Sequence, residues 1–464
     1  MTLKEKLFNP IDMTKGNIVE KISLFTIPMI IGNIAQQLYA TVDTIIVGHY
    51  VGDNALSAVG SAAPVFNLLL VLFMGVATGA SILVAQYFGA KDSEGLSKTI
   101  GNCITLIIIA SIILMIFSPL VIRPLLVILD TPNSIIDWCH DYLLIMSLGV
   151  GGMAFYNIVS GVLRGLGDSI SALYYLLIAT VINIILDIVF VAYFNMGVSG
   201  VAIATVISQF ACSILTIRKL LSKKELFTLN KESFNLRGGY ARKIIKLGLP
   251  SGLTQLIFSM SLVLVQSLTN SFGELVIAAN VIIMRVDGFA MMPNVSFSTA
   301  MTTFAGQNVG AKKYDRLFVG ARQGTFLAIG VSSVITLILL AFGKDIMHLF
   351  TDTNELINFS YKFMTYISFG YVVFAITQAL SGVLRGAGDT VSPMWISIIT
   401  SVIIRVCLAY ILVYFTKSEA NPNGIPEVLY ISLLLSWISG SILTMLVYRF
   451  GNWRKKYLLN NVWI

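Results

Sequence analysis

Two polar residues lie one helical turn apart inside an apolar stretch long enough to cross a lipid bilayer. The stretch YLLIATVINIILDIVFVAYF covers residues 175–194 and contains Asn183 and Asp187. Their spacing of four places both side chains on one face of a helix. An ionised carboxylate in the hydrocarbon interior costs about 2.5–3.5 kcal/mol or more unless another group compensates it. Asp187 therefore needs either a function or a partner.

A second polar stripe runs along the first apolar stretch of the chain, where Gln36, Tyr39 and Asp43 share one helical face. If helices rise about 1.5 Å per residue, Asp43, Asp187 and Thr205 lie at one level, roughly 10 Å below the outer surface. Such oxygen ligands suit a small hard cation, and a coupled acid pair that carries a proton fits them equally well. The alternative is that each aspartate only bonds neighbouring helices. The predicted coupling site for Na⁺ or H⁺ consists of Asp43, Asn183, Asp187 and Thr205.

Composition places these residues in an integral membrane protein. Of 464 residues, 56% are hydrophobic and 12% are charged, whereas a soluble domain has about 45–50% and about 25%. The excess of 31 Lys and Arg over 23 Asp and Glu lies in short loops, which is a topology signal and not a nucleic-acid-binding patch. The histidines and cysteines lack metal-site spacing, so we expect no cofactor and no metal beyond a possible Na⁺.

Hydropathy predicts an all-α protein with twelve membrane-spanning helices. Basic residues gather in the loops of one side, which predicts a multi-pass protein of the cell membrane with both termini in the cytoplasm. The predicted spans are residues 22–49, 55–84, 99–119, 141–163, 169–193, 198–218, 249–272, 276–306, 323–342, 361–384, 391–416 and 427–448.

The chain repeats itself at one offset. SGVLRGLGDS at residues 160–169 recurs as SGVLRGAGDT at 381–390, and QYFGAK at 86–91 is matched by QNVGAK at 307–312, both 221 residues later. Two matches at one offset indicate two homologous halves, and an even number of spans in each makes the halves parallel. The basic linker between them is expected to face lipid headgroups or water. We predict an N-terminal six-helix lobe at 1–220, a cytoplasmic linker at 221–240 and a C-terminal six-helix lobe at 241–464.

The repeated LRGLGD and LRGAGD motifs predict tight cytoplasmic turns, in which glycine permits the reversal and Asp168 or Asp389 caps the next helix. A GxGD intramembrane protease needs two acids facing one catalytic site, and the duplication argues against that. The sequence shows no nucleophile, metal or phosphate-binding constellation, so we expect no enzyme. The loop GAKDSEGLSK after the second span lacks the closely spaced acid and arginines of the major facilitator family.

The second half has lost the acidic site. At the 221-residue offset, the positions of Asp43, Asn183 and Asp187 hold Leu264, Ile404 and Leu408. Instead, the eighth and eleventh spans carry three charged residues far from the predicted helix ends. We expect them to form a buried ion pair that joins helices, with a part in substrate binding or gating as the alternative. These residues are Arg285, Asp287 and Arg405.

The segments IPMIIGNIAQQLYATVDTIIVGHYVGDNALSAVG, QYFGAKD and NIILD and both SGVLRG turns together resemble the multidrug and toxic compound extrusion (MATE) transporters over nearly the whole chain. The resemblance implies two six-helix lobes around a V-shaped cleft, alternating access, and exchange of drugs for Na⁺ or H⁺. It also implies that Asp43, Asn183, Asp187 and Thr205 match the family's N-lobe cation site. Some members carry acids in the seventh and tenth spans, whereas this chain has none there.

We therefore expect a secondary active antiporter that exports small amphipathic, often cationic compounds, contacts membrane lipid and functions as a monomer. A lipid-linked oligosaccharide flippase of the same superfamily and a structural or receptor-like membrane protein are the alternatives. Flexible methionines and aromatic or polar side chains suit varied ligands, although ordinary packing also explains them. The candidate substrate contacts are Gln36, Tyr39, Met260, Met284 and Met291.

Overall fold

The computed structural model describes residues 10–129, 131–419 and 421–454, and all regular structure in these ranges is helical. The predicted cytoplasmic ends, residues 1–9 and 455–464, lie outside the described residues. The chain divides into two compact units. The first unit contains the described residues up to Asp12 and Ile27–Gly252, and the second contains Met13–Thr26 and the residues from Leu253 onward. Residues 221–240, predicted as a separate linker, thus belong to the first unit.

Two long helices pass from one unit to the other. Helix α2 (Ile18–Tyr50) begins in the second unit and continues in the first, while α9 (Tyr240–Asn270) begins in the first and continues in the second. The start of α9 packs tightly in the first unit, because a Cβ atom on Gly79 would lie 2.2 Å from the carbonyl oxygen of Ile244. Small residues of this kind let membrane helices approach closely.

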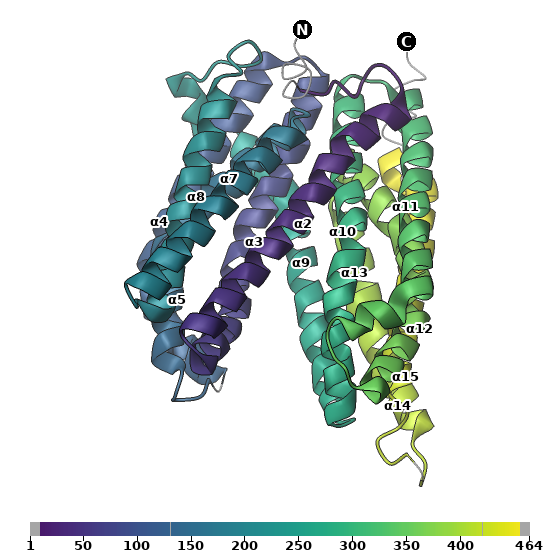
Figure 1. Cartoon of the computed structure of the whole chain (residues 1–464). Helices are drawn as coiled ribbons and strands as arrows, with labels where there is room; N and C mark the ends of the chain where they lie inside the picture. Colours follow the sequence, from purple (N-terminus) through teal and green to yellow (C-terminus); the bar gives the residue numbers. More distant parts are fainter. Residues whose placement is uncertain (1–9, 130, 420, 455–464) are drawn as a thin grey trace. The chain divides into compact units, whose positions relative to one another are not determined.

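The first unit is a bundle in which α3 packs against α6, and α8 packs against α6 and α7. Figure 1 labels α3, α7 and α8 of this bundle. A π-helical segment, η1, directly follows α7. The helices of this unit are α3 (Asp53–Gly89), α4 (Ser93–Ile128), α5 (Ile136–Leu148), α6 (Val150–Gly165), α7 (Ser169–Asp187), η1 (Ile188–Tyr193), α8 (Gly197–Leu221), and the short η2 (Lys231–Phe234) and η3 (Leu236–Gly238).

In the second unit α10 packs against α12 and α11, and α12 packs against α15 (Figure 1). Its core contains the fully buried Tyr371, whose ring centroid lies 5.7 Å from that of Trp437. A second π-helical segment, η4, directly precedes α14. The helices of this unit are α10 (Glu274–Gly310), α11 (Tyr314–His348), α12 (Asn354–Gly386), α13 (Val391–Ser397), η4 (Ile398–Ile404), α14 (Arg405–Thr416) and α15 (Glu427–Phe450).

Eleven helices in the described ranges are long and apolar enough to cross a membrane, and the pair α5 and α6, bent by 53°, makes the twelfth. The twelve predicted spans are confirmed, with a break inside the span predicted at 141–163. The break falls at Gly149, where a Cβ atom would lie 2.3 Å from Val206 Cγ2 of α8. Glycine at this position allows α8 to approach the bend.

Both repeated turns have the predicted geometry. Gly167 and Gly388 adopt φ angles of +90° and +93°, a region that favours glycine. Asp168 Oδ1 accepts a hydrogen bond from Ser171 N at 3.0 Å, and Asp389 Oδ1 accepts one from Ser392 N at 3.0 Å. The prediction that these aspartates cap the following helices is confirmed.

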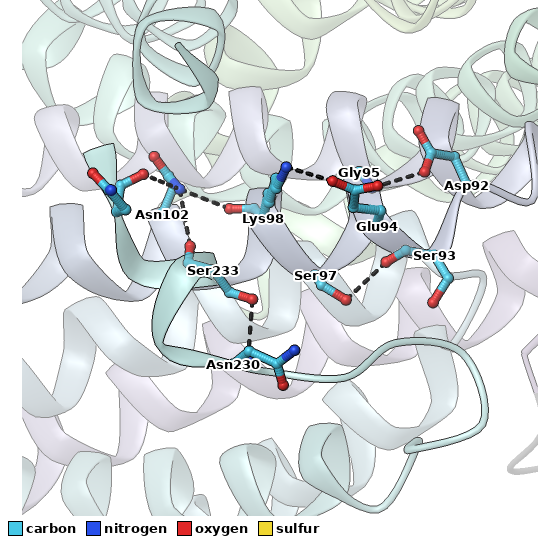
Figure 2. A network of polar contacts seen from close by, with 10 residues as sticks. Asp92, Ser93, Glu94, Gly95, Ser97, Lys98, Asn102, Asn230 and Ser233 are labelled. Atoms are coloured by element: carbon cyan, nitrogen blue, oxygen red, sulfur yellow. Dashed lines mark hydrogen bonds and ion pairs between the residues drawn. The ribbon is translucent and has the colours of Figure 1, made fainter. Parts of the chain in front are cut away.

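The segment after α8 folds onto the first unit through polar contacts with α4 (Figure 2). Asn102 Nδ2 donates to the carbonyl oxygen of Ser233 at 3.0 Å, and Asn102 Oδ1 accepts from Ala241 N at 3.1 Å. Lys223 Nζ lies 3.0 Å from the buried carboxylate of Asp168, and its own side chain is only 9% exposed. The expectation that the basic residues of this segment face lipid or water is therefore wrong for Lys223, because the buried Asp168 needs a counter-charge.

Candidate functional site

Three helices of the first unit bring together the four residues of the predicted coupling site. Asp43 comes from α2, Asn183 and Asp187 from successive turns of α7, and Thr205 from α8. Asn183 and Asp187 are fully buried and Thr205 is nearly so, while Asp43 is half-buried. The common depth estimated from helix rise therefore corresponds to a real cluster of side chains.

Asn183 lies at the centre of this cluster and contacts the other members. Its amide satisfies its neighbours when the nitrogen faces the carboxyl groups, donating to Asp43 Oδ1 at 2.9 Å and to Asp187 Oδ2 at 3.0 Å. The amide oxygen then accepts from Tyr39 Oη at 3.3 Å and lies 3.5 Å from Thr205 Oγ1. One uncharged side chain thus holds two carboxyl groups on one side and two hydroxyl groups on the other.

The carboxyl groups of Asp43 and Asp187 both contact the amide nitrogen of Asn183, so they share one buried site. Asp187 Oδ1 is buried and has no hydrogen-bond partner. Two carboxylates that share a buried site cannot both ionise unless a cation compensates them. A shared proton meets this need, and a Na⁺ ion would meet it by using carboxylate, amide and hydroxyl oxygens as ligands. This arrangement is suited to reversible binding of one small cation.

Several other side chains line this cluster. The Tyr39 hydroxyl, predicted as a substrate contact, lies 3.4 Å from Thr205 Oγ1 and beside the hydroxyl of buried Ser208. Tyr142 of α5 is buried within electrostatic range of both carboxyl groups. Ser208 could have been found from its spacing of three from Thr205 on one helical face. Nothing in the sequence relates Tyr142 to the cluster, because only the tertiary fold brings α5 there.

The remaining predicted substrate contacts differ in the exposure of their side chains. Gln36 is exposed on α2, and the side chains of Met260 and Met284 are 56% and 48% exposed. Met291 is half-buried and packs against the hydrophobic core of the second unit. The exposed methionines offer flexible apolar surface, whereas Met291 acts as a packing residue.

The predicted buried ion pair of the second unit is not formed. Arg285 is exposed, because two residues of separation on a helix direct it away from Asp287. Arg405 is buried and Asp287 is half-buried, yet among the described side chains no nitrogen–oxygen contact within 4.0 Å joins them. Within the described ranges no group of three or more His, Cys, Asp or Glu could hold a metal ion.

Comparison with known proteins gives consistent results. The model of the MatE family matches residues 28–189 and 250–411, one match in each half of the repeat. The chain is 29% identical to the probable multidrug resistance protein YoeA of Bacillus subtilis (strain 168), over 91% of this chain and 93% of that protein. It is 26% identical to the probable multidrug resistance protein NorM of Thermotoga maritima, over 92% of this chain and 91% of that protein.

Solved structures share the fold. An outward-facing multidrug resistance MATE family transporter of the MOP superfamily superimposes with a TM-score of 0.89 at 23% identity, covering 96% of this chain and 98% of that one. A MATE structure in the bent conformation also gives a TM-score of 0.89 at 23% identity, covering 97% and 99%. The twelve-helix, two-lobe architecture predicted from the repeat is thus the fold of these transporters.

Proposed function

Because the chain belongs to the MatE family, we propose that this membrane transporter exports amphipathic, often cationic compounds in exchange for Na⁺ or H⁺. The observation that carries the proposal is the pair of carboxyl groups, Asp43 and Asp187, bridged by the buried amide of Asn183. Relatives that match almost the whole chain bear the name multidrug resistance protein. The protein works as a monomer and needs no cofactor other than the coupling ion.

The exchange works through two states of the transporter. A cation at Asp43 and Asp187 stabilises one state and the exported compound stabilises the other, so binding of each favours release of its competitor. Only a ligand with different affinities for the two states can shift the equilibrium between them. The cluster supports this role because two adjacent carboxyl groups are costly to bury without a cation.

The charge of the cluster also supports a cationic substrate class. A flippase of lipid-linked oligosaccharides has to bind a pyrophosphate, which calls for arginines or lysines. The buried cluster of the first unit is acidic and contains no basic side chain among its described members, Tyr39, Asp43, Asn183, Asp187 and Thr205. This chemistry favours exchange of cations over transport of an anionic headgroup.

The excess of basic residues in the loops of one side supports an orientation with both termini in the cytoplasm. A protease-sensitive tag at the C-terminus tests this directly. The tag should be cleaved in inside-out vesicles and protected in right-side-out vesicles. The reverse result would invert the proposed topology.

The central test replaces Asp187 with Asn and measures efflux of ethidium by vesicles under an imposed Na⁺ or pH gradient. Asn has nearly the same size as Asp, but it is uncharged and can neither release a proton nor supply a negative charge to Na⁺. We therefore expect gradient-driven efflux to fall to the background of empty vesicles. The matched control is Asp352→Asn, because the Asp352 side chain is fully exposed at the surface, and it should leave efflux unchanged. Efflux equal to wild type in a folded Asp187→Asn variant would refute the coupling site.

A further inference from the structure

The interior of the second unit contains a polar cluster outside the site described above. Asp287 of α10, Tyr371 of α12 and Arg405 of α14 come from three different helices. Tyr371 is fully buried and Arg405 is only 7% exposed. Asp287 Oδ1, Tyr371 Oη and Arg405 Nε are all buried and lack hydrogen-bond partners. One acceptor, one hydroxyl group and one donor in this unit are thus buried without hydrogen-bond partners, which is rare in folded proteins.

These three groups lie near enough to act on one another. The Asp287 carboxyl group interacts electrostatically with the Tyr371 hydroxyl and the Arg405 guanidinium, while Tyr371 Oη and Arg405 Nε form no hydrogen bond. The closed ion pair is nevertheless absent, because their charged atoms are more than 4.0 Å apart in the described structure. Burying opposite charges without contact leaves most of their desolvation uncompensated. The cluster therefore needs a further occupant or a change of protonation.

A local change of helix geometry places Arg405 in this cluster. In the first unit the inward positions of α7 include Ala179 and Asn183, four residues apart. In the second unit the step from buried Thr400 to buried Arg405 is five residues, because η4 forms a π-helical segment there. The inward position that corresponds to Asn183 is therefore Arg405 and not Ile404. Both units thus carry a polar cluster on the equivalent helix at an equivalent level.

A series of polar side chains leads along the second unit toward Asp287. From the exposed Asn270 at the end of α9, Gln266 Nε2 donates to Asn270 Oδ1 at 2.8 Å, and Asn280 Nδ2 donates to Gln266 Oε1 at 3.1 Å. Asn280 precedes Asp287 by two helical turns on the same face of α10, and the Tyr430 hydroxyl donates to its amide oxygen at 3.1 Å. Polar side chains thus line the end of the second unit up to two helical turns from Asp287.

We propose that Asp287 is a second proton-binding site, and that Tyr371 and Arg405 are the positioning residues that make its proton exchangeable. A carboxylate in full contact with an arginine stays ionised, and a fully isolated buried carboxylic acid stays protonated. A counter-charge beyond ion-pair distance, together with a hydroxyl that can donate to the ionised form or accept from the protonated form, makes both forms accessible. The ligand of this site is a proton, because the adjacent guanidinium repels a metal cation.

The charged and titratable groups that face Asp287 come from two neighbouring elements. Tyr371 faces it from α12 and Arg405 faces it from α14. Helix α11, which also packs against α10, contributes the hydroxyl of Ser332, which donates to Asn294 Oδ1 at 2.6 Å and does not titrate. On α10 itself Arg285 is exposed on another side of the helix. The proton equilibrium of Asp287 therefore depends on Tyr371 and Arg405.

The test is infrared difference spectroscopy of the full-length protein in lipid nanodiscs, which detects the carbonyl stretch of a protonated carboxyl group as pH is varied. We expect a band whose intensity changes with pH in wild type, because the proposal makes both the ionised and the protonated form of Asp287 accessible. The band should persist in the Asp43→Asn, Asp187→Asn double variant and be lost when Asp287→Asn is added to that double variant. A double variant without a titrating band, or a spectrum that does not change when Asp287→Asn is added to the double variant, would overturn the proposal.

Two further variants keep the test decisive if Asp287→Asn does not fold. Arg405→Gln removes the counter-charge, so the intensity of the Asp287 band should no longer depend on pH. Tyr371→Phe keeps the ring against Trp437, so it should shift the pH at which the band changes without loss of the band. An unchanged titration in both variants contradicts the assigned roles. The readout needs no transported compound, so it remains valid even if the export function proposed above fails.

Discussion

Asn183 holds the two carboxyl groups of the first unit in one arrangement. Its amide nitrogen donates to both Asp43 and Asp187, and its oxygen faces Tyr39 and Thr205. Binding of Na⁺ would need the amide oxygen among the ligands, because a metal cation is repelled by an N–H group. The orientation assigned from the neighbouring hydrogen-bond partners is therefore the one that suits a shared proton. Rotation of this amide would turn its oxygen toward the carboxyl groups, as binding of Na⁺ requires.

Replacing Asn183 with Ala removes both donors that position the carboxyl groups. Hydrogen bonds to charged groups contribute about 1.5–3 kcal/mol each, so gradient-driven efflux should fall by about tenfold or more, in line with about 1.4 kcal/mol per factor of ten. Thr180→Ala is the matched control, because the Thr180 hydroxyl donates to the carbonyl oxygen of Leu176 in its own helix. Equal losses in the two variants would mean that Asn183 only contributes to packing.

At the scale of single residues, part of the site could be predicted from the sequence. The spacing of Asn183 and Asp187, together with helix depth, was sufficient to group Asp43 and Thr205 with them. The orientation of the amide and the approach of Tyr142 depend on neighbours that are distant in sequence, so no local pattern could reveal them. In the second unit, the attraction expected between Asp287 and Arg405 exists, but only the coordinates show that the ion pair is open.

At the scale of helices, the break at Gly149 depends on close packing against α8. Gly149→Ala would place a methyl group 2.3 Å from Val206 Cγ2, and overpacking of this kind typically costs about 1–3 kcal/mol. We expect a lower melting temperature in detergent and weaker efflux. Gly60→Ala is the control, since no atom lies within 4 Å of its added Cβ, and it should keep or raise the melting temperature. A stable Gly149→Ala variant would show that α8 can move away freely.

Hydropathy found every long helix but could not detect the changes in helix geometry within them. The π-helical segments η1 and η4 adjoin Asp187 and Arg405, and such segments are frequent at functional sites. The constant offset of 221 residues matched Asn183 to Ile404. Because η4 shifts the inward face by one residue, the structurally equivalent position is Arg405. Composition carries no signal for this shift, since the residues of η4 are as apolar as those of an α-helix.

At the scale of the whole molecule, the features that the sequence predicted correctly are those that depend on a few neighbouring residues. The two LRGxGD turns were predictable because a capping aspartate and a glycine with positive φ act over a few residues. The division into units was harder to predict, since α2 and α9 each contribute to both units. The matching repeat motifs also gave no sign of how the two units differ in their polar residues. The first unit contains an acid pair, whereas the equivalent helix of the second unit contributes Arg405.

The proposed exchange makes a reciprocal prediction for the whole transporter. If the coupling cation weakens the affinity for a cationic dye by some factor, the dye must weaken the affinity for the cation by the same factor, because the two binding equilibria are linked. Typical coupling energies predict a factor of about 5–150. The first factor comes from the dye affinity, measured by fluorescence anisotropy at several Na⁺ concentrations and pH values. The second comes from the cation affinity, measured by calorimetry at several dye concentrations.

In the Asp43→Asn, Asp187→Asn double variant both factors should become one, while the dye still binds, because the substitutions remove the cation site and leave the rest of the transporter intact. The Asp352→Asn control should retain both factors. A wild-type factor of one both with Na⁺ and with pH would refute antiport through this acid pair. A factor found with Na⁺ alone or with pH alone would identify the coupling ion, and would thereby decide which orientation of the Asn183 amide accompanies transport.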